Sequence, residues 1–402
     1  LNDAGYTRLC EADSWNLAAG GKYYVSRGGT ALIAFRIPEA APKGFLMSAS
    51  HADRPTFKVK ENGELCSAYT RLAVERYGGM LMAPWLDRPL SIAGRVMVET
   101  EDGVESKLIN IDRDLTMIPN VAIHMNRSAN DGYKWNPAVD TIPLLGGKDA
   151  KGKLSKLLEE AAGGKILGHD LYLYVRQKAS IWGIDNEFIS SAALDDLECA
   201  YTSVQAFLQA ENAQQINVCA VFDNEEVGST TKQGANSTFL NDVLSRTAAA
   251  LGATDAETRA AIACSFMVSG DNAHALHPNH PEKYDADNRT FMNGGVVIKF
   301  NANQRYTTDG ISAAVLRSVC KKAEVDVQTF YNRADMPGGS TLGNIANTQV
   351  SLNTIDIGLP QLAMHSSYET AAVKDLEYLE KAMTAYYSTS LTVADDGGCI
   401  IR

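Results

Sequence analysis

Two patterns of hydrophobic and polar residues follow one another along the chain. In its first and last parts, apolar runs of strand length, such as FLMSASH at 45–51 and INVCAVF at 216–222, are separated by amphipathic segments of helical length. Continuous apolar runs of this kind are typical of buried strands in a sheet that helices cover on both faces. Between these parts, segments such as LSIAGRVMVET at 90–100 alternate in polarity and are separated by turn residues, which predicts a mainly β region.

The change of pattern predicts the domain boundaries. Residues 1–57 and 188–402 are expected to form one discontinuous α/β domain, and residues 58–187 an inserted β-rich domain. In the α/β domain we expect a helix within residues 1–19 and a hairpin over 21–37, because YYVSR and ALIAFRI flank a Gly-Gly turn.

In the insertion, the charged segment 148–164 predicts a helix, and His124 and His169 are expected on strands.

Composition narrows the class of protein. Of 402 residues, 45% are hydrophobic and 21% are charged, which is ordinary for a globular protein with a large core. The net charge of −11 and the lack of a basic run argue against nucleic acid as a partner. No apolar run approaches the roughly 20 residues of a membrane-spanning helix, and no signal peptide is visible. Seven dispersed cysteines predict reduced thiols and a cytoplasmic location.

The strongest chemical signal follows the strand at 216–222. The chain continues there as DNEEVG, with Asp223, Glu225 and Glu226 within four residues. Carboxylates so close raise one another's pKa values unless a cation neutralises them. The segment therefore predicts a metal site or an acid/base site, and the alternative is a solvated acidic turn.

Other apolar or small-residue runs also end in acidic or histidine side chains. The positions concerned are His51 with Asp53, Asp195, Asp271 and His365. If the strands are parallel in one sheet, these side chains meet at the carboxyl edge, where ligands bind in α/β folds. The alternatives are a surface histidine for His51 and a helix-capping acid for Asp195.

The set contains nitrogen and oxygen ligands without cysteine, which suits zinc, manganese or cobalt. The set contains more carboxylates than one zinc ion binds. Two ions that share one bridging carboxylate, as in aminopeptidases, could bind them all. Glu225 and Glu226 are adjacent, so one can bind metal while the other remains free as a general base.

Six ordered segments resemble the aspartyl aminopeptidase-like family of dinuclear zinc exopeptidases. They are HADRP, SAALDDL, FDNEEVGS, SGDNAHALHPN, NANQRY and PQLAMHSSYE, and they span most of the chain. The resemblance implies a zinc-peptidase-like α/β/α sandwich, an inserted β-rich dimerisation domain, and assembly of dimers into a dodecamer.

The resemblance also implies roles for individual residues, each matched through its motif. Two divalent ions, Zn²⁺ or alternatively Co²⁺ or Mn²⁺, would be bound by five side chains: His51 and Asp271 for the first ion, Glu226 and His365 for the second, and Asp195 between the two. Asp53 would orient His51, and Glu225 would be the general base. His124 would reach the active site of a neighbouring subunit, contact the substrate and stabilise the oxyanion.

The activity implied is hydrolysis of the N-terminal peptide bond of peptides, with a preference for Asp or Glu. Lys299 is a candidate cation for the acidic side chain, and the alternative is a solvent-facing strand lysine. The Gly-rich segment 335–347 offers backbone N–H groups that could bind a carboxylate or an oxyanion. Competing functions are a deacylase, a deblocking aminopeptidase, and a non-catalytic cargo or scaffold protein.

Overall fold

The chain forms two compact units. The computed structural model describes residues 1–211, 214–394 and 397–402. Unit 1 comprises Leu1–Asp53, Ile181–Met364 and Thr370–Arg402, and unit 2 comprises Arg54–Ser180 and His365–Glu369. The chain therefore passes between units after Asp53 and after Ser180, where the sequence pattern predicts passages after residues 57 and 187. The return of residues 365–369 to unit 2 has no counterpart in the sequence pattern.

Unit 1 is built on a nine-stranded sheet. In spatial order its strands are β1 (Thr7–Leu9), β2 (Lys22–Arg27), β3 (Ala31–Arg36), β13 (Ile216–Phe222), β4 (Phe45–His51), β14 (Phe266–Gly270), β18 (Asn353–Gly358), β16 (Val296–Phe300) and β17 (Val327–Tyr331). The central strands β13, β4, β14 and β18 are parallel. Their apolar runs are buried, as expected for strands covered on both faces.

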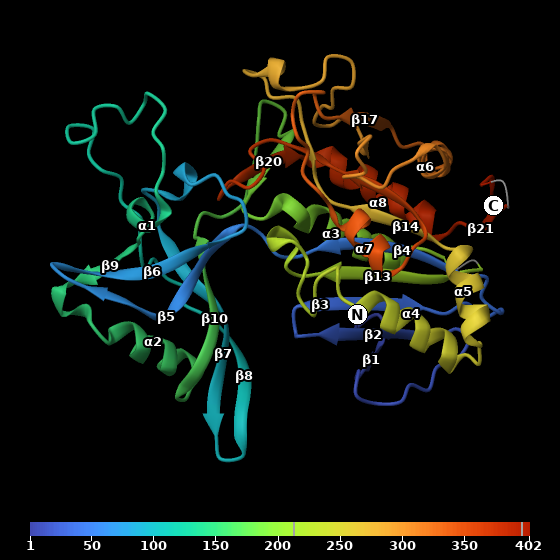
Figure 1. Cartoon of the computed structure of the whole chain (residues 1–402), viewed down its shortest axis with the longest axis horizontal. Coiled ribbons are helices and arrows are strands. Elements are labelled where there is room, and N and C mark those ends of the chain that lie inside the picture. Colours follow the sequence, from blue (N-terminus) through green and yellow to red (C-terminus); the bar gives the residue numbers. More distant parts are fainter. Residues whose placement is uncertain (212–213, 395–396) are drawn as a thin grey trace. The chain divides into compact units, whose positions relative to one another are not determined.

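Helices cover both faces of this sheet (Figure 1). Successive residues of a strand point to opposite faces, so Leu46 packs with α3 (Leu194–Gln209), α6 (Gly310–Lys322) and α8 (Val373–Tyr387). Its neighbours Phe45 and Met47 pack with α4 (Phe239–Ala250) and α7 (Leu342–Gln349). The three layers confirm the predicted α/β/α sandwich.

The smaller elements complete the description. They are the three-stranded sheet of β11 (Ser180–Trp182), β12 (Phe188–Ser191) and β20 (Glu369–Ala372), the pairs β15 (Ala273–His274) with β19 (Pro360–Gln361) and β21 (Leu391–Val393) with β22 (Cys399–Ile401), helix α5 (Asp255–Ala263), and the 3₁₀ turns η3 (Glu225–Val227) and η4 (Pro281–Lys283).

The predicted hairpin over 21–37 is confirmed by antiparallel β2 and β3. The predicted helix within residues 1–19 is wrong. Thr7–Leu9 instead pairs in parallel with Tyr23–Val25 of β2. This long-range pairing supplies backbone hydrogen bonds that a local helical pattern does not anticipate.

Unit 2 contains a six-stranded antiparallel sheet with its own apolar core. In spatial order the strands are β8 (Gly103–Asn110), β7 (Leu90–Thr100), β10 (Ile166–Val175), β5 (Thr56–Cys66), β6 (Tyr69–Tyr77) and β9 (Leu144–Gly147), and the unit also holds α1 (Pro137–Asp140), α2 (Lys153–Ala162), η1 (Ala83–Trp85) and η2 (Lys148–Ala150). The predicted β-rich region and the helix within 148–164 are therefore present, and His169 lies on β10 as expected.

His124 does not lie on a strand, so that prediction is wrong. It is exposed in a turn in which the N–H groups of Met125 and Asn126 both donate to the carbonyl of Ala122. The alternating apolar residues of this segment suggested a strand, but Val121, Ile123 and Met125 are themselves 56%, 45% and 83% exposed. Without an apolar face to cover, their alternation does not produce strand pairing.

Candidate metal centre

Three parallel strands of unit 1 end at the same edge of the sheet. His51 is the last residue of β4, the acidic segment Asp223–Glu226 follows β13, and Asp271 follows β14. His51 is in register with Phe222. The parallel arrangement predicted from the apolar runs therefore brings these side chains together.

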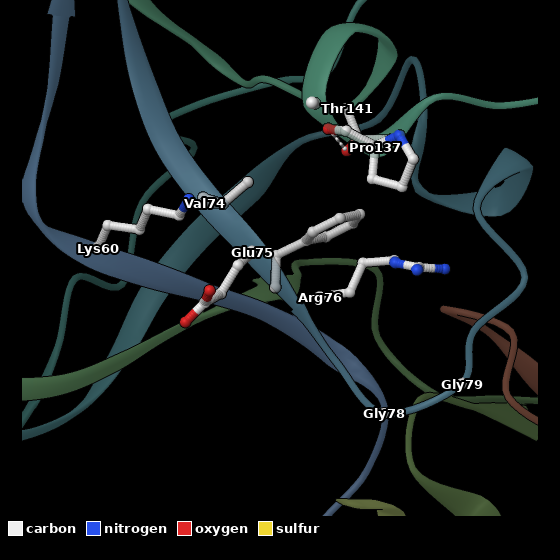
Figure 2. Close-up of a pocket in the computed structure, with 10 residues that line it drawn as sticks. Lys60, Val74, Glu75, Arg76, Gly78, Gly79, Pro137 and Thr141 are labelled. Atoms are coloured by element: carbon white, nitrogen blue, oxygen red, sulfur yellow. Dashed lines mark hydrogen bonds between the residues drawn. The ribbon is translucent and has the colours of Figure 1, made fainter.

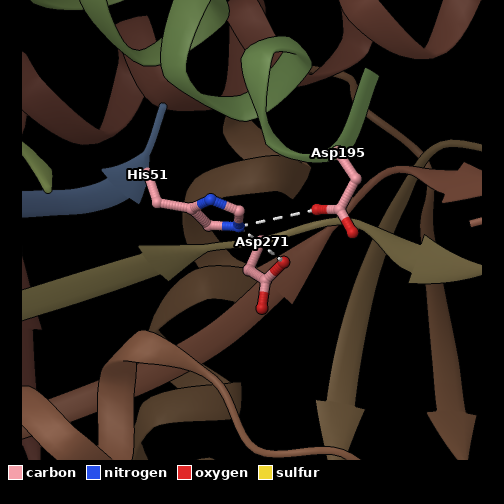
Figure 3. A group of neighbouring side chains, drawn as sticks. All are labelled: His51, Asp195 and Asp271. Atoms are coloured by element: carbon pink, nitrogen blue, oxygen red, sulfur yellow. Dashed lines mark ion pairs between the residues drawn. The ribbon is translucent and has the colours of Figure 1, made fainter. Parts of the chain in front are cut away.

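A first group consists of His51, Asp195 and Asp271 (Figure 3). Nε2 of His51 lies 3.6 Å from Oδ1 of Asp195 and 3.7 Å from Oδ1 of Asp271. The three residues are 1%, 3% and 8% exposed, so their charges are largely removed from water. Asp195 comes from the start of α3, where its backbone departs from helical values, and the alternative of a surface histidine for His51 is wrong.

The charge of His51 is set by its neighbours. Burial alone would lower the pKa of His51, but the carboxylates of Asp195, Asp271 and Asp53 outweigh it and raise that pKa well above its ordinary value. Without a metal the imidazole therefore favours a proton, whereas a metal ion would take the place of that proton as the positive charge.

Asp53 connects His51 to the acidic segment. Its Oδ1 lies 3.4 Å from Nδ1 of His51 and accepts a hydrogen bond of 3.0 Å from the N–H of Glu225. Its Oδ2 accepts another of 3.2 Å from the N–H of Glu226. The carbonyl of Asp53 also lies 3.1 Å from Nδ1 of His51. One residue thus fixes the imidazole and the backbone that carries both glutamates.

Burial and neighbouring carboxylates favour the protonated form of Glu225. Burial raises the pKa of Glu225 to about 7, Asp271, Asp195 and Asp53 contribute in the same direction, and His51 opposes them. A base is most effective when its pKa lies near the working pH. Glu225 lies in η3, between Asn224 at φ +61° and Gly228 at φ +95°. These left-handed residues turn the chain sharply after β13.

The donor set of this edge fits divalent metal ions. One ligand atom from each of His51, Asp195 and Asp271 lies within 4.8 Å of the others, and the same holds for His51, Glu225 and Glu226. One imidazole with several carboxylates is a combination found at zinc sites, and the observed spacing suits atoms that share an ion.

Two residues missed by the sequence analysis support this group. Asp196 is fully buried, and its Oδ2 accepts a hydrogen bond of 3.1 Å from the N–H of His51. Nδ2 of Asn272 lies 3.0 Å from each of three acceptors, which share its two hydrogens: the carbonyl of Leu194 and side-chain oxygens of Glu198 and Gln361. The sequence contained one signal for Asp196: two acids follow one another at the start of a helix, although one acid is enough to cap it.

Lys299 is not solvent-facing, so that alternative is wrong. It is 2% exposed on β16, and its ammonium donates to the carbonyls of Asp271 at 2.7 Å and Asn272 at 3.3 Å. Nζ also lies 3.6 Å from Oδ2 of Asp271. Burial alone would lower the pKa of Lys299, but Asp271, Tyr306 and Asp356 reverse that effect and raise it. Lys299 therefore carries its charge directly beside a candidate ligand.

His365 and His124 belong to unit 2. His365 has φ +64°, and its N–H donates to Oε1 of Glu369 at 2.7 Å, while its carbonyl accepts from Leu81. Unit 2 also contains a cavity of about 510 Å³ lined by residues such as Lys60, Glu75 and Arg76 (Figure 2). Neither a histidine nor any of the proposed metal ligands lines it.

Comparisons with known proteins identify a family. Residues 1–387 match the family model described as aminopeptidase I zinc metalloprotease (M18). A curated relative from Clostridium acetobutylicum, described as a probable M18 family aminopeptidase 2, is 44% identical over 96% of this chain and 93% of its own length. A relative of the same description from Pseudomonas aeruginosa is 42% identical over 97% of this chain and 92% of its own.

Solved structures agree with this result. One chain from a cryo-EM structure of the Ape4 and Nbr1 complex superposes with a TM-score of 0.92 at 36% identity and covers 96% of this chain and 80% of its own. A chain from the structure of an S. cerevisiae mApe1 dodecamer gives a TM-score of 0.84 at 27% identity, with 96% and 90% covered. Among the described residues of the chain, no helix has the length and apolarity needed to span a membrane.

Proposed function

The chain belongs to the M18 family of zinc aminopeptidases, and we propose that Glu225 is the general base with which it hydrolyses the N-terminal peptide bond of peptides. Family membership makes it a metallo-aminopeptidase. The observation that carries the mechanism is the position of Glu225, whose pKa is raised to about 7 beside a buried group of one imidazole and several carboxylates.

Two zinc ions fit the proposed ligand set. His51 and Asp271 would hold the first, Glu226 and His365 the second, and Asp195 would be shared. The distances among His51, Asp195 and Asp271 support the first position. A divalent ion bound there supplies a Lewis acid for the scissile carbonyl and makes water more acidic.

The protein groups then carry the proton. A carboxylate oxygen of Glu225 takes a proton from the attacking water and later gives it to the nitrogen of the leaving amine, so the base is regenerated. Asp53 holds the backbone of Glu225 through the hydrogen bond to its N–H and so keeps the carboxylate in place. Burial of the group limits reorganisation of solvent as charge develops.

We propose that His124 and Lys299 contact the substrate. We also propose that the chain self-associates. His124 is exposed on a turn, as expected of a residue that would reach a neighbouring subunit and stabilise an oxyanion. A solved relative is described as a dodecamer, which supports assembly of this chain through dimers into a similar particle. Lys299 is the cation that we propose for an acidic N-terminal side chain, and its ammonium lies 3.6 Å from Oδ2 of Asp271, a proposed ligand of the first ion.

Metal removal tests the proposed function. The protein is dialysed against a chelator, and Zn²⁺, Co²⁺ or Mn²⁺ is then titrated back while hydrolysis of Glu-, Asp-, Leu- and acetyl-Leu-p-nitroanilides is followed. We expect activity on free aminoacyl substrates to disappear and to return as two ions bind per chain. Full activity after chelation, or release of acetyl groups in place of free amino acids, would contradict the proposal.

A further inference from the structure

Asp195 and Asp271 approach the same imidazole from elements that are distant in sequence (Figure 3). Asp195 lies at the start of α3, whereas Asp271 follows β14. Both carboxylates are buried, and when both are ionised they repel one another. A fixed separation before a cation binds therefore requires contacts between the segments that carry them.

Asn272 supplies such contacts. It directly follows Asp271, is 3% exposed, and its Nδ2 lies 3.0 Å from the carbonyl oxygen of Leu194, the residue directly before Asp195. Nδ2 also lies 3.0 Å from a side-chain oxygen of Glu198, which is on α3 as well. The amide of Asn272 thus joins the segments that carry two proposed metal ligands.

Other contacts fix the orientation of this amide. Oδ1 of Asn272 accepts a hydrogen bond of 3.2 Å from Sγ of Cys199, and Nδ2 lies 3.0 Å from Oε1 of Gln361 on β19. The backbone carbonyl of Asn272 accepts from Nζ of Lys299 at 3.3 Å. All of these partners are buried, so water does not compete for the same contacts. The side chain and the backbone of Asn272 are therefore both held in place.

The start of α3 depends on a contact from outside the helix. The backbone angles of Asp195 and Asp196 are not helical, so regular helical hydrogen bonding does not by itself fix the position of Asp195. An apolar side chain at position 272 would withdraw a donor from the carbonyl of Leu194 and from Glu198. Buried acceptors that lose a donor are destabilising, and a shift of the helix start is the available adjustment.

We propose that Asn272 is a positioning residue that sets the separation of the carboxylates of Asp195 and Asp271, and thereby the affinity for the ions that they bind. It acts through these ligands and is not one itself. The inference rests on the proposed function for the identity of the ligands. Loss of Asn272 should loosen the metal centre while the number and type of its ligands remain unchanged.

The test replaces Asn272 by leucine, which has a similar shape but no donor. Asn217→Leu is the matched control, because Asn217 is a buried asparagine near the start of β13, at the opposite end of that strand from the acidic segment. It is 1% exposed and donates through Nδ2 to the carbonyl of Tyr387 at 2.8 Å. Both variants lose a buried donor, so urea unfolding should show a similar decrease in stability for both.

Metal binding should separate the two variants. Competition with a fluorescent chelator measures the affinity for Zn²⁺. We expect Asn272→Leu to bind zinc about 10- to 100-fold more weakly than wild type, because removal of groups that hold metal ligands has effects of this size, and Asn217→Leu to remain within about twofold. The visible spectrum of Co²⁺-loaded protein depends on ligand geometry and should change only in Asn272→Leu. Unchanged zinc affinity in Asn272→Leu, or an equal loss in Asn217→Leu, would overturn the proposal.

A second variant covers the case in which Asn272→Leu does not fold. Asn272→Ser keeps one donor of shorter reach, and its zinc affinity should still be several-fold below that of wild type. Wild-type affinity in Asn272→Ser would overturn the proposal. Wild-type protein that binds no zinc would overturn the proposed function as well, whereas equal binding of two ions by wild type and both Asn272 variants would overturn only the role of Asn272.

Discussion

Carboxylates in the two units have opposite surroundings. On β10 of unit 2, Asp170 lies between Lys58 and Arg95, at 2.9 and 3.0 Å, with 41% of its side chain exposed. Partial burial would raise the pKa of Asp170, but the two cations outweigh this effect and lower it. At the edge of the sheet in unit 1, by contrast, burial and neighbouring carboxylates raise the pKa of Glu225 to about 7.

The difference shows how a carboxylate can serve either structure or chemistry. Asp170 is compensated by side chains of the chain itself, so it gains nothing from an added ion. The acids around His51 are more deeply buried and are crowded by like charges, which makes their association with a divalent cation favourable. In an ion pair the negative charge is neutralised by side chains of the protein itself. In a binding site it is neutralised by a ligand, here a divalent cation.

The largest expected effect is that of Glu225→Gln. If Glu225 moves the proton, kcat should fall by about 10²- to 10⁴-fold while zinc content remains unchanged, because the amide cannot accept a proton. Steady-state kinetics and metal analysis of the same sample check this. Turnover close to that of wild type would remove Glu225 from its role as base.

Asp53→Asn should have a smaller effect. It weakens the contacts to His51 and to the N–H groups of both glutamates, and loss of such a supporting carboxylate costs roughly 10- to 100-fold in metal affinity or activity. Competition with a fluorescent chelator measures the affinity. Asp170→Asn is the matched control in unit 2 and should leave metal affinity unchanged; an equal loss in both would point to general destabilisation.

The pH profile should follow the ionisation of Glu225. A base must be deprotonated, so kcat/KM should fall about tenfold for each unit of pH below the pKa of Glu225, which is about 7 without bound metal and is lowered by the positive charge of bound ions. Rates of zinc-loaded enzyme from pH 5 to 9 test this expectation. A profile that is flat between pH 5 and 8 would show that the base of the reaction titrates elsewhere.

Lys299→Met should alter substrate preference by a few-fold. The variant keeps most of the apolar stem but removes the charge beside Asp271. We expect kcat/KM to fall more for Glu-p-nitroanilide than for Leu-p-nitroanilide at saturating zinc, because only the acidic substrate is attracted by that charge. An equal decrease for the two would mean that Lys299 only supports Asp271.

The smallest effect is expected for the stability of Asp170→Asn. A half-exposed ion pair contributes less than about 1 kcal/mol to the free energy of unfolding. Since the pKa of Asp170 is lowered in the folded state, its contribution is present above the unfolded pKa and is lost as pH falls through the folded one. Urea unfolding of wild type and variant at pH 7 and pH 3 measures this: the difference should shrink at pH 3.

The sequence by itself determined the class of fold and the candidate ligands. Apolar runs such as 45–51 and 216–222 are typical of strands buried between two layers of helices, and the acids and histidines that end them are visible in the chain. The sequence also resembled one family through ordered motifs, which the comparisons confirmed. The predicted β-rich character of residues 58–187 followed equally from local alternation.

Only the tertiary structure decided burial, partners and charge. Whether Lys299 faces solvent, whether His124 joins a strand, and how Asp196 holds the N–H of His51 depend on segments distant in sequence. The spacing of apolar residues can be read from the sequence and predicts helices and strands. The pKa of a side chain and the shape of a cavity depend on contacts that form only when the chain has folded.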